Sequence, residues 1–291
     1  MIGIFSAIGA VFSWTYACSI WRNQTTLNKP IHINFVKNLL AFLIFIPAFT
    51  FIDFTKDSLY IFILIISGII GIGIGDTFYL NSLNKIGTRK TLSIEAISPI
   101  IAAFSGKLFI NENLSITSWI GIFIVTASLI LIIKKQTYLI DKDENFILNK
   151  FNFWNYIYSF LSVFCAVIAA LLSRIVFLES NLNPAQTTEI RLFGSIIFLF
   201  LITKTKIQFS LDQLNRKDRI KFIFSIILGT NVGIFLQQVV FQELPLGVGW
   251  TLLSTSPIIS LFFAKQEEGY LSKDIIFLTF TLFAGIVLIV L

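Results

Sequence analysis

Charged side chains, cysteine, histidine and methionine are all scarce in this sequence. Only 13% of the 291 residues are charged, which is too little polar surface to cover a water-soluble globule of this length. The two cysteines, Cys18 and Cys165, fall in separate apolar runs, where a thiol packs as a small apolar side chain, so we expect neither a disulfide nor a metal site. The single histidine, His32, lies in a predicted loop, and no nucleotide-binding motif is present, so no cofactor is expected.

Long apolar runs are what the sequence has in abundance. Hydrophobic residues make up 56% of the chain, and its mean hydropathy is +0.85. A helix needs about 20 mostly apolar residues to cross a bilayer. Ten such runs are found, at Ile2–Ile20, Asn34–Ile52, Leu59–Leu80, Thr91–Ile110, Ser115–Ile133, Trp154–Phe177, Ala185–Thr203, Ile220–Phe241, Leu246–Ala264 and Leu271–Leu291. We therefore predict an all-α protein with ten transmembrane helices, located in the cell membrane, which in a prokaryote is the inner membrane.

The net charge of +6 comes from basic loops and does not indicate a nucleic-acid partner. Most of the 22 Lys and Arg residues fall in loops that follow the first, third, fifth, seventh and ninth predicted helices. Because loops rich in Lys and Arg remain in the cytoplasm, this asymmetry predicts that both termini face outward. The expected partner of these surfaces is the lipid bilayer.

One stretch of the sequence occurs twice. At a single offset, Gly71–Lys107 matches Gly229–Lys265, and within it Ser98-Pro99-Ile100-Ile101 matches Ser256-Pro257-Ile258-Ile259 letter for letter. Flanking matches at the same offset indicate an internal duplication.

The duplication predicts the division of the chain. We expect a first five-helix repeat at residues 1–133, a polar linker at 134–153 and a second five-helix repeat at 154–291. Five crossings are an odd number, so the second repeat enters the membrane upside-down relative to the first, as in an inverted repeat.

Pro99 and Pro257 occupy matched positions inside the predicted helices of the duplicated stretch. A proline lacks an N–H and clashes with the carbonyl four residues earlier, here that of Glu95 and of Leu253. Membrane carriers build sites near the bilayer midplane from such broken helices with spare carbonyls. We therefore expect a substrate site between the two prolines, reached by alternating access as the two halves rock about it.

Two charged residues inside apolar runs are candidates for that site. Glu95 lies one helical turn before Pro99, and it either binds a proton or a substrate amine in a cavity, or sits at the headgroups beside Arg89 and Lys90. Arg191 lies well inside the seventh predicted helix, with Lys37 as its repeat counterpart. It either binds an anion, or forms a structural salt bridge with Glu189 or Glu95.

Asp76 ends a glycine-rich run within the third predicted helix. The residues Gly73-Ile74-Gly75-Asp76 fit the G-x-G-D signature of intramembrane aspartyl proteases, which need two carboxylates that share a proton. No second aspartate lies at membrane depth, so we prefer to interpret the glycines as small faces for close helix packing and Asp76 as a cavity residue. The protease-like enzyme remains an alternative.

Polar residues also gather in the eighth and ninth predicted helices. Thr251, Ser254 and Thr255 share one helix face just before Pro257, and Ser256 and Gln238 lie nearby. This polar stripe suits an uncharged or zwitterionic ligand, although hydroxyls and amides in membrane helices often bond only their own backbone or a neighbouring helix. Trp14 either stacks on the substrate or belongs to an interfacial aromatic belt.

The segments from Leu92 to Pro99 and from Leu252 to Pro257, each inside a five-helix half, resemble the EamA-type members of the drug/metabolite transporter superfamily. The resemblance covers essentially the whole chain. Two features depart from the family pattern, because Ser98 stands where the family usually has an acidic residue directly before the proline, and because family members are commonly drawn with cytoplasmic termini.

The resemblance implies a permease that exports or exchanges small metabolites, amino acids or amphipathic compounds through a cavity between the third, fourth, eighth and ninth helices. Without a nucleotide-binding motif, transport depends on a gradient, with protons as a possible coupling ion, or on exchange. A non-transporting membrane scaffold is a further alternative, and the sequence leaves a monomer and a homodimer equally open.

Overall fold

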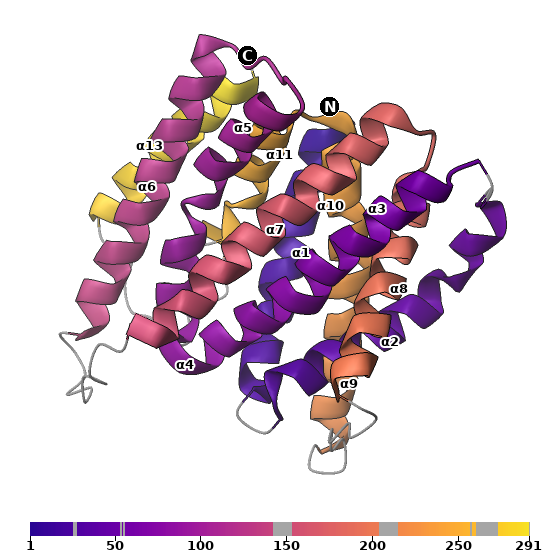
Figure 1. Cartoon of the computed structure of the whole chain (residues 1–291). Coiled ribbons are helices and arrows are strands. Elements are labelled where there is room, and N and C mark those ends of the chain that lie inside the picture. Colours follow the sequence, from indigo (N-terminus) through magenta and orange to yellow (C-terminus); the bar gives the residue numbers. More distant parts are fainter. Residues whose placement is uncertain are drawn as a thin grey trace.

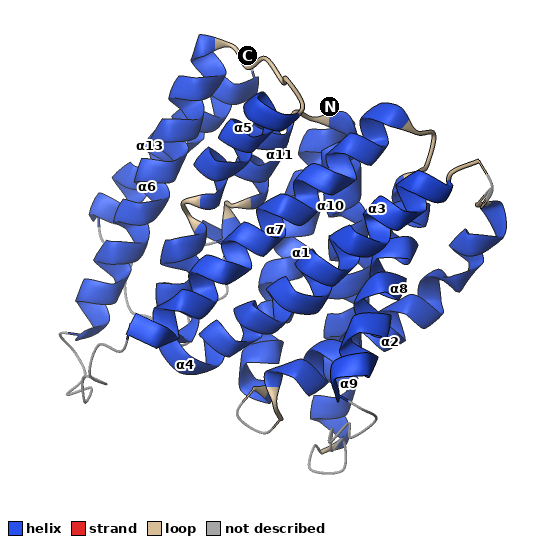
Figure 2. Cartoon of the chain, viewed as in Figure 1, coloured by secondary structure: helices blue, strands red, loops and turns tan. Residues whose placement is uncertain are grey.

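The protein is a bundle of helices, described in a computed structural model at residues 1–25, 28–52, 54, 56–141, 153–203, 215–256, 258–259 and 273–290. No strand occurs among these residues, as Figure 2 shows. The elements are α1 (Ile2–Gln24), α2 (Pro30–Phe45), η1 (Ile46–Phe51), α3 (Ser58–Gly68), η2 (Ile69–Gly75), α4 (Asp76–Glu95), α5 (Ser98–Phe109), α6 (Ile116–Asp141), α7 (Phe153–Glu179), α8 (Pro184–Thr203), α9 (Arg216–Ser225), η3 (Ile226–Val232), α10 (Gly233–Glu243), α11 (Leu246–Leu253) and α13 (Lys273–Val290).

The helices have the length and composition of a multi-pass integral membrane protein. Seven spans among the described residues are long and apolar enough to cross a bilayer, and Ser98–Phe109 and Asp274–Val290 are shorter apolar helices. Apolar side chains such as Phe62, Leu108 and Phe280 face outward from the bundle, where lipid covers them. Both chain ends lie at the same edge of the bundle (Figure 1).

Helices of the first half pack mainly against helices of the second half. The N-terminal helix α1 contacts η3 and α10, and reciprocally α7 contacts η2 and α4. Further contacts between the halves pair α2 and α3 with α8, α5 with α11 and α6 with α13 (Figure 1). The first span of each half thus packs against the third span of the other half, whereas α2, α5 and α6 each contact their counterparts.

The third span of each half contains a π-helical segment, η2 in the first half and η3 in the second. Within η2 the Asn34 amide of α2 donates to the carbonyls of Ile72 and Gly73, at 2.7 and 3.1 Å. A π-helical turn widens the helix and disturbs its regular ladder of hydrogen bonds, and such turns recur at functional sites. The two segments fall at corresponding positions of the duplicated sequence.

The helix before Pro99 breaks where the sequence predicted. Helix α4 ends at Glu95 and α5 begins at Ser98, but the Glu95 carbonyl is not spare, because the Ser98 hydroxyl donates to it at 2.6 Å. In the second half, α11 ends at Leu253, whose carbonyl accepts from the Ser256 hydroxyl at 3.3 Å. The serine before each proline therefore bonds the carbonyl that the proline cannot, which corrects the expectation of free carbonyls. Pro257 itself lies outside the described residues.

Two predicted boundaries differ from the structure. The third and fourth runs were expected to be separated by a loop. In the structure their connection is a tight kink, because the residues of α4 form two helices that meet at Gly87, which has a φ of 78° that favours glycine. Helix α6 continues to Asp141, so the first part of the predicted linker 134–153 is helical. Residues 142–152 of the predicted linker lie outside the described residues.

Candidate functional site

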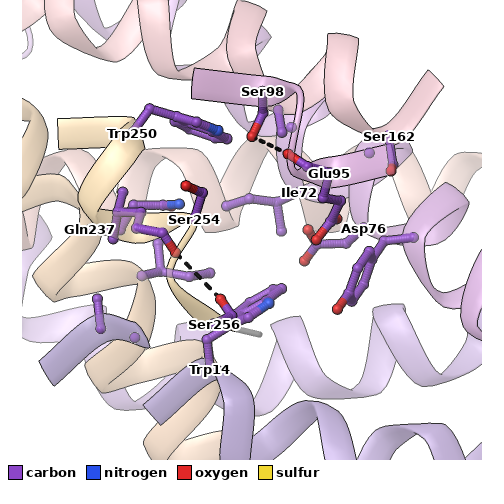
Figure 3. Close-up of a pocket in the computed structure, with 18 of the residues that line it drawn as sticks. Trp14, Ile72, Asp76, Glu95, Ser98, Ser162, Gln237, Trp250, Ser254 and Ser256 are labelled. Carbon is purple, nitrogen blue, oxygen red and sulfur yellow. Dashed lines mark hydrogen bonds between the residues drawn. The ribbon is translucent and has the colours of Figure 1, made fainter. Parts of the chain in front are cut away.

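A cavity of about 140 Å³ lies between the two halves and receives side chains from both (Figure 3). It is lined by Ala10, Val11, Trp14, Gly71, Ile72, Gly75, Asp76, Tyr79, Glu95, Ser98, Ser162, Val163, Ala166, Arg191, Gly233, Ile234, Gln237, Phe241, Trp250, Leu253, Ser254 and Ser256. Seven of these lining residues were predicted from the sequence, namely Trp14, Asp76, Glu95, Ser98, Arg191, Ser254 and Ser256.

Asp76 is held by a buried cation that sequence reasoning did not assign to it. Lys37 Nζ, on α2, lies 2.6 Å from Asp76 Oδ2 and 3.1 Å from Asn38 Oδ1, and the Lys37 side chain is 1% exposed. The ammonium also lies 5.1 Å from the Trp21 ring centroid and 5.9 Å from that of Trp14. Asp76 is thus a cavity residue paired with a cation, whereas an aspartyl protease needs two carboxylates that share a proton.

Glu95 lies in the wall of the cavity, at the end of α4 where the chain turns toward Pro99. Its carboxyl group and that of Asp76 point toward the same part of the cavity (Figure 3). Among the described residues it has no ion-pair partner. The cavity therefore contains one carboxylate that is paired and one that is not.

Arg191 lies on α8, 3% exposed, and also lines the cavity. Its Nε and Nη1 atoms have no hydrogen-bond partner within the described part of the chain, and neither carboxylate oxygen of Glu189 has one. The predicted salt bridge from Arg191 to Glu189 or Glu95 is therefore absent among these residues. Among the described residues, no anion is bonded to this buried guanidinium group.

The predicted polar stripe on the ninth helix divides into two groups. Ser254 and Ser256 line the cavity, whereas Thr251 and Thr255 donate to carbonyls of their own helix, those of Gly247 at 2.6 Å and Leu252 at 2.7 Å. Membrane helices often satisfy threonine hydroxyls in this way. Thr251 and Thr255 were expected to line the site, but they do not line this cavity.

Two further expectations are corrected. Gln238 is fully buried away from the cavity, with neither amide atom bonded to a described residue, and its neighbour Gln237 takes the lining position. A shift of one residue turns a side chain by about 100° around a helix, which a sequence pattern in an apolar run does not resolve. Pro99 is buried and does not line the cavity; it lies just after the break between α4 and α5.

Aromatic rings supply the apolar part of the wall. Trp14 packs edge-on against Trp21, with ring centroids 5.3 Å apart, and Trp250 stacks on Phe241 at 5.6 Å with an interplanar angle of 4°. The Tyr79 hydroxyl donates to Cys18 Sγ at 3.5 Å. Tyr79, Phe241 and Ser162 were missed by sequence analysis, since single aromatic or serine residues in apolar runs carry no distinguishing pattern.

Comparisons with known proteins identify related folds and a family for this chain. No curated protein matches the sequence. Among 27 matching chains of solved structures, one crystal structure has a TM-score of 0.72 and 12% sequence identity, covering 98% of this chain and 95% of its own. Such a likeness at low identity shows the fold alone. The model of the EamA-like transporter family matches residues 1–134 and 153–291, which is nearly the whole chain. The protein is therefore a multi-pass membrane protein that belongs to the EamA-like transporter family.

Proposed function

We propose that this protein is a secondary transporter that moves small metabolites, amino acids or amphipathic compounds across the membrane, as an exporter or exchanger. The observation that carries the proposal is the cavity between the two halves, into which Asp76, Glu95 and Arg191 project from membrane-spanning helices. A charged residue at the centre of a membrane helix costs about 2.5–3.5 kcal/mol on insertion scales, and such residues usually mark substrate or ion pathways.

In this proposal the chain has ten membrane-spanning segments, arranged as two inverted repeats of five at residues 1–133 and 154–291. The reciprocal packing supports it, because α1 contacts η3 and α10 while its counterpart α7 contacts η2 and α4. The paths of the helices in Figure 1 agree, since α1 starts at the edge that carries the termini and α7 starts at the opposite edge. A pseudo-two-fold axis between the halves would relate these contacts.

Alternating access then requires the two ends of the cavity to open in turn. On the side of the termini, Glu112 Oε1 accepts from Arg174 Nε at 2.8 Å and Glu112 Oε2 accepts from the Leu246 backbone N–H at 2.7 Å. Arg174 Nη1 also donates to the carbonyl of Phe241, a cavity residue, at 2.9 Å. These bonds join the loop after α5 to α7, α10 and α11, and so connect the two halves at this end. We infer that this end is closed in the conformation described.

Flux through reconstituted protein tests the function. A thermal-shift screen of amino acids and other small metabolites on purified protein would select ligands, and liposomes loaded with a selected ligand should then exchange it for external radiolabelled ligand. Repeating the measurement with and without a pH gradient distinguishes proton coupling from exchange. If correctly folded protein exchanges none of the ligands that it binds, the chain is a non-transporting scaffold and the proposal is wrong.

A further inference from the structure

The two halves place a buried cation at equivalent positions of their second helices. Helices α2 and α8 both begin at a proline, Pro30 and Pro184, and Lys37 and Arg191 each lie about two turns after it. Both side chains are almost fully buried. Each half therefore has a cation at an equivalent position, but the surroundings of the two cations differ.

The first half supplies an anion for its cation and the second half does not. Asp76, directly after Gly75, pairs with Lys37 at 2.6 Å. Gly75 matches Gly233 in the duplicated sequence, so the position equivalent to Asp76 is Ile234, an uncharged residue. Ile234 and Arg191 line the same cavity, and Arg191 Nε and Nη1 lack partners among the described residues. Asp76 also lines this cavity, but its Oδ2 is held by Lys37.

From this difference we infer that Arg191 binds the carboxylate of the transported molecule, which takes the place that Asp76 fills in the other half. A guanidinium group presents parallel N–H donors that match a carboxylate, and an unpaired buried charge is costly, so a ligand anion gains from both effects. The inference rests on the proposed transport function and specifies the substrate class of the same cavity.

The size and charge of the cavity further restrict the class of ligand that it can bind. A cavity of about 150 Å³ holds a molecule the size of benzene, and the cavity here is about 140 Å³. Trp14 and Trp250 offer flat apolar surfaces to such a molecule. The carboxyl groups of Glu95 and Asp76 in the same wall disfavour a dianion such as phosphate, because like charges repel strongly in a low-dielectric site. The ligand class is therefore a small monocarboxylate.

Introducing a carboxylate at position 234 tests whether Arg191 binds the carboxylate of the ligand. Ile234→Asp places a carboxylate where the first half has Asp76, so it should pair with Arg191 and exclude the ligand. Ile234→Asn has nearly the same shape without the charge and serves as the matched control. The probes are acetate, butyrate, benzoate and phenylacetate, each compared with its amide by calorimetric titration of the purified full-length protein.

Wild-type protein should bind at least one of these acids about thirtyfold or more tightly than its amide, and Ile234→Asp and Arg191→Gln should lose that preference. Ile234→Asn, which alters the cavity wall without adding a charge, should show a larger preference for the acid than Ile234→Asp does. Arg191→Lys, which keeps the charge but not the paired donors, should retain part of it. Ile234→Asp should also unfold at a higher temperature than Ile234→Asn, because it gains an internal ion pair, and this readout needs no ligand.

Three results would overturn the inference: no acid of the panel binds in preference to its amide, Ile234→Asp keeps the preference, or Ile234→Asp is less stable than Ile234→Asn. The same experiments distinguish failure of this inference from failure of the proposed transport function. If neutral solutes are exchanged across liposomes while acids show no preference, the protein is a transporter and only the role of Arg191 is wrong.

Discussion

At the scale of single residues, the charges of the cavity differ in how each is compensated. Lys37 and Asp76 neutralise each other at 2.6 Å, while Glu95 and Arg191 have no ion-pair partner among the described residues. Paired buried charges are structural by default, because removing one partner leaves the other exposed to a low-dielectric environment. Unpaired ones are available for a proton or a ligand. The four residues are thus expected to respond to substitution in different ways.

Lys37→Met should leave the Asp76 carboxylate without its ion-pair partner and lower the free energy of unfolding by about 3–5 kcal/mol. The double variant Lys37→Met/Asp76→Leu removes both charges and should recover most of this loss. Unfolding of the purified proteins in detergent measures the effect. Strictly additive losses in the double variant would show that the two residues do not interact.

Glu95→Gln should abolish or uncouple transport while the protein still inserts into the membrane. The amide keeps the shape of the side chain but cannot bind or release a proton, so any pH dependence that comes from Glu95 disappears. Flux into liposomes at several pH values measures this. Glu243→Gln, which changes an exposed carboxylate, is the control and should behave as wild type. Wild-type flux with wild-type pH dependence in Glu95→Gln would refute the coupling role.

At the scale of helices, glycines bring the two halves into close contact and so position the cavity residues. A Cβ added at Gly68 would collide with the backbone carbonyl of Arg191, and one added at Gly194 would lie 2.5 Å from the carbonyl oxygen of Ile65. Helices α3 and α8 therefore pack backbone to backbone where Arg191 enters the cavity. Small residues permit such approaches in membranes, where association depends on packing.

Gly68→Ala should therefore lower the free energy of unfolding by about 1–3 kcal/mol, because neither backbone can move without disturbing its helix. Gly233→Ala is the matched control, since a Cβ there would lie 3.4 Å from the nearest atom, the Leu228 carbonyl oxygen, which is an ordinary contact. The control should be neutral or slightly stabilising, as alanine favours the helix. Unfolding in detergent compares the two. Equal stability of both variants would mean that α3 and α8 do not approach this closely.

At the scale of the whole molecule, the ion pair between Glu112 and Arg174 connects the two halves on the side of the termini. Both side chains are 11% exposed, so water screens the pair only weakly. Gly3, near the N-terminus, packs against Glu243 and Leu244 at the same end. Loss of this connection is expected to open the cavity toward the termini.

Glu112→Gln should increase access to the cavity from this side. Ser162, buried in the cavity wall, can be replaced by cysteine in a background without Cys18 and Cys165. A membrane-impermeant maleimide applied from the side of the termini should label Ser162→Cys several times faster when Glu112→Gln is present. Glu243→Gln at the same end is the control. Unchanged labelling with Glu112→Gln would argue against a closing role for the pair.

The distribution of Lys and Arg residues in the sequence predicts the orientation of the molecule. Most of the 22 Lys and Arg residues fall in loops that the predicted helices place on the side opposite the termini, and loops rich in such residues stay in the cytoplasm. A tag added after Leu291 should therefore be accessible to antibody on intact cells. Accessibility only after the cytoplasmic side is opened would reverse the assignment and agree with the orientation commonly drawn for the family.

Much of the architecture could be predicted from the sequence, because apolar runs and an internal repeat are local or self-comparing signals. Among the described residues, the runs overlap the seven spans that are long and apolar enough to cross a bilayer and the two shorter apolar helices. The matched prolines predicted the break between Glu95 and Ser98. Asp76, Glu95, Arg191, Ser98 and Ser254 were predicted as cavity residues and line it. The residues that were misplaced, Gln238, Thr251 and Thr255, lie on helix faces that a polar pattern alone does not orient.

The sequence by itself determined that the chain lies in a membrane, that it is a duplication and that charged residues occur inside its helices. Only the tertiary structure decided which of those charges meet. Lys37 and Asp76 are distant in sequence and pair because α2 packs against α4. Arg191, whose half carries Ile234 at the position equivalent to Asp76, has no ion-pair partner in the described part of the chain. Pairing between helices depends on their packing and rotation, and a single sequence does not encode these in any local pattern.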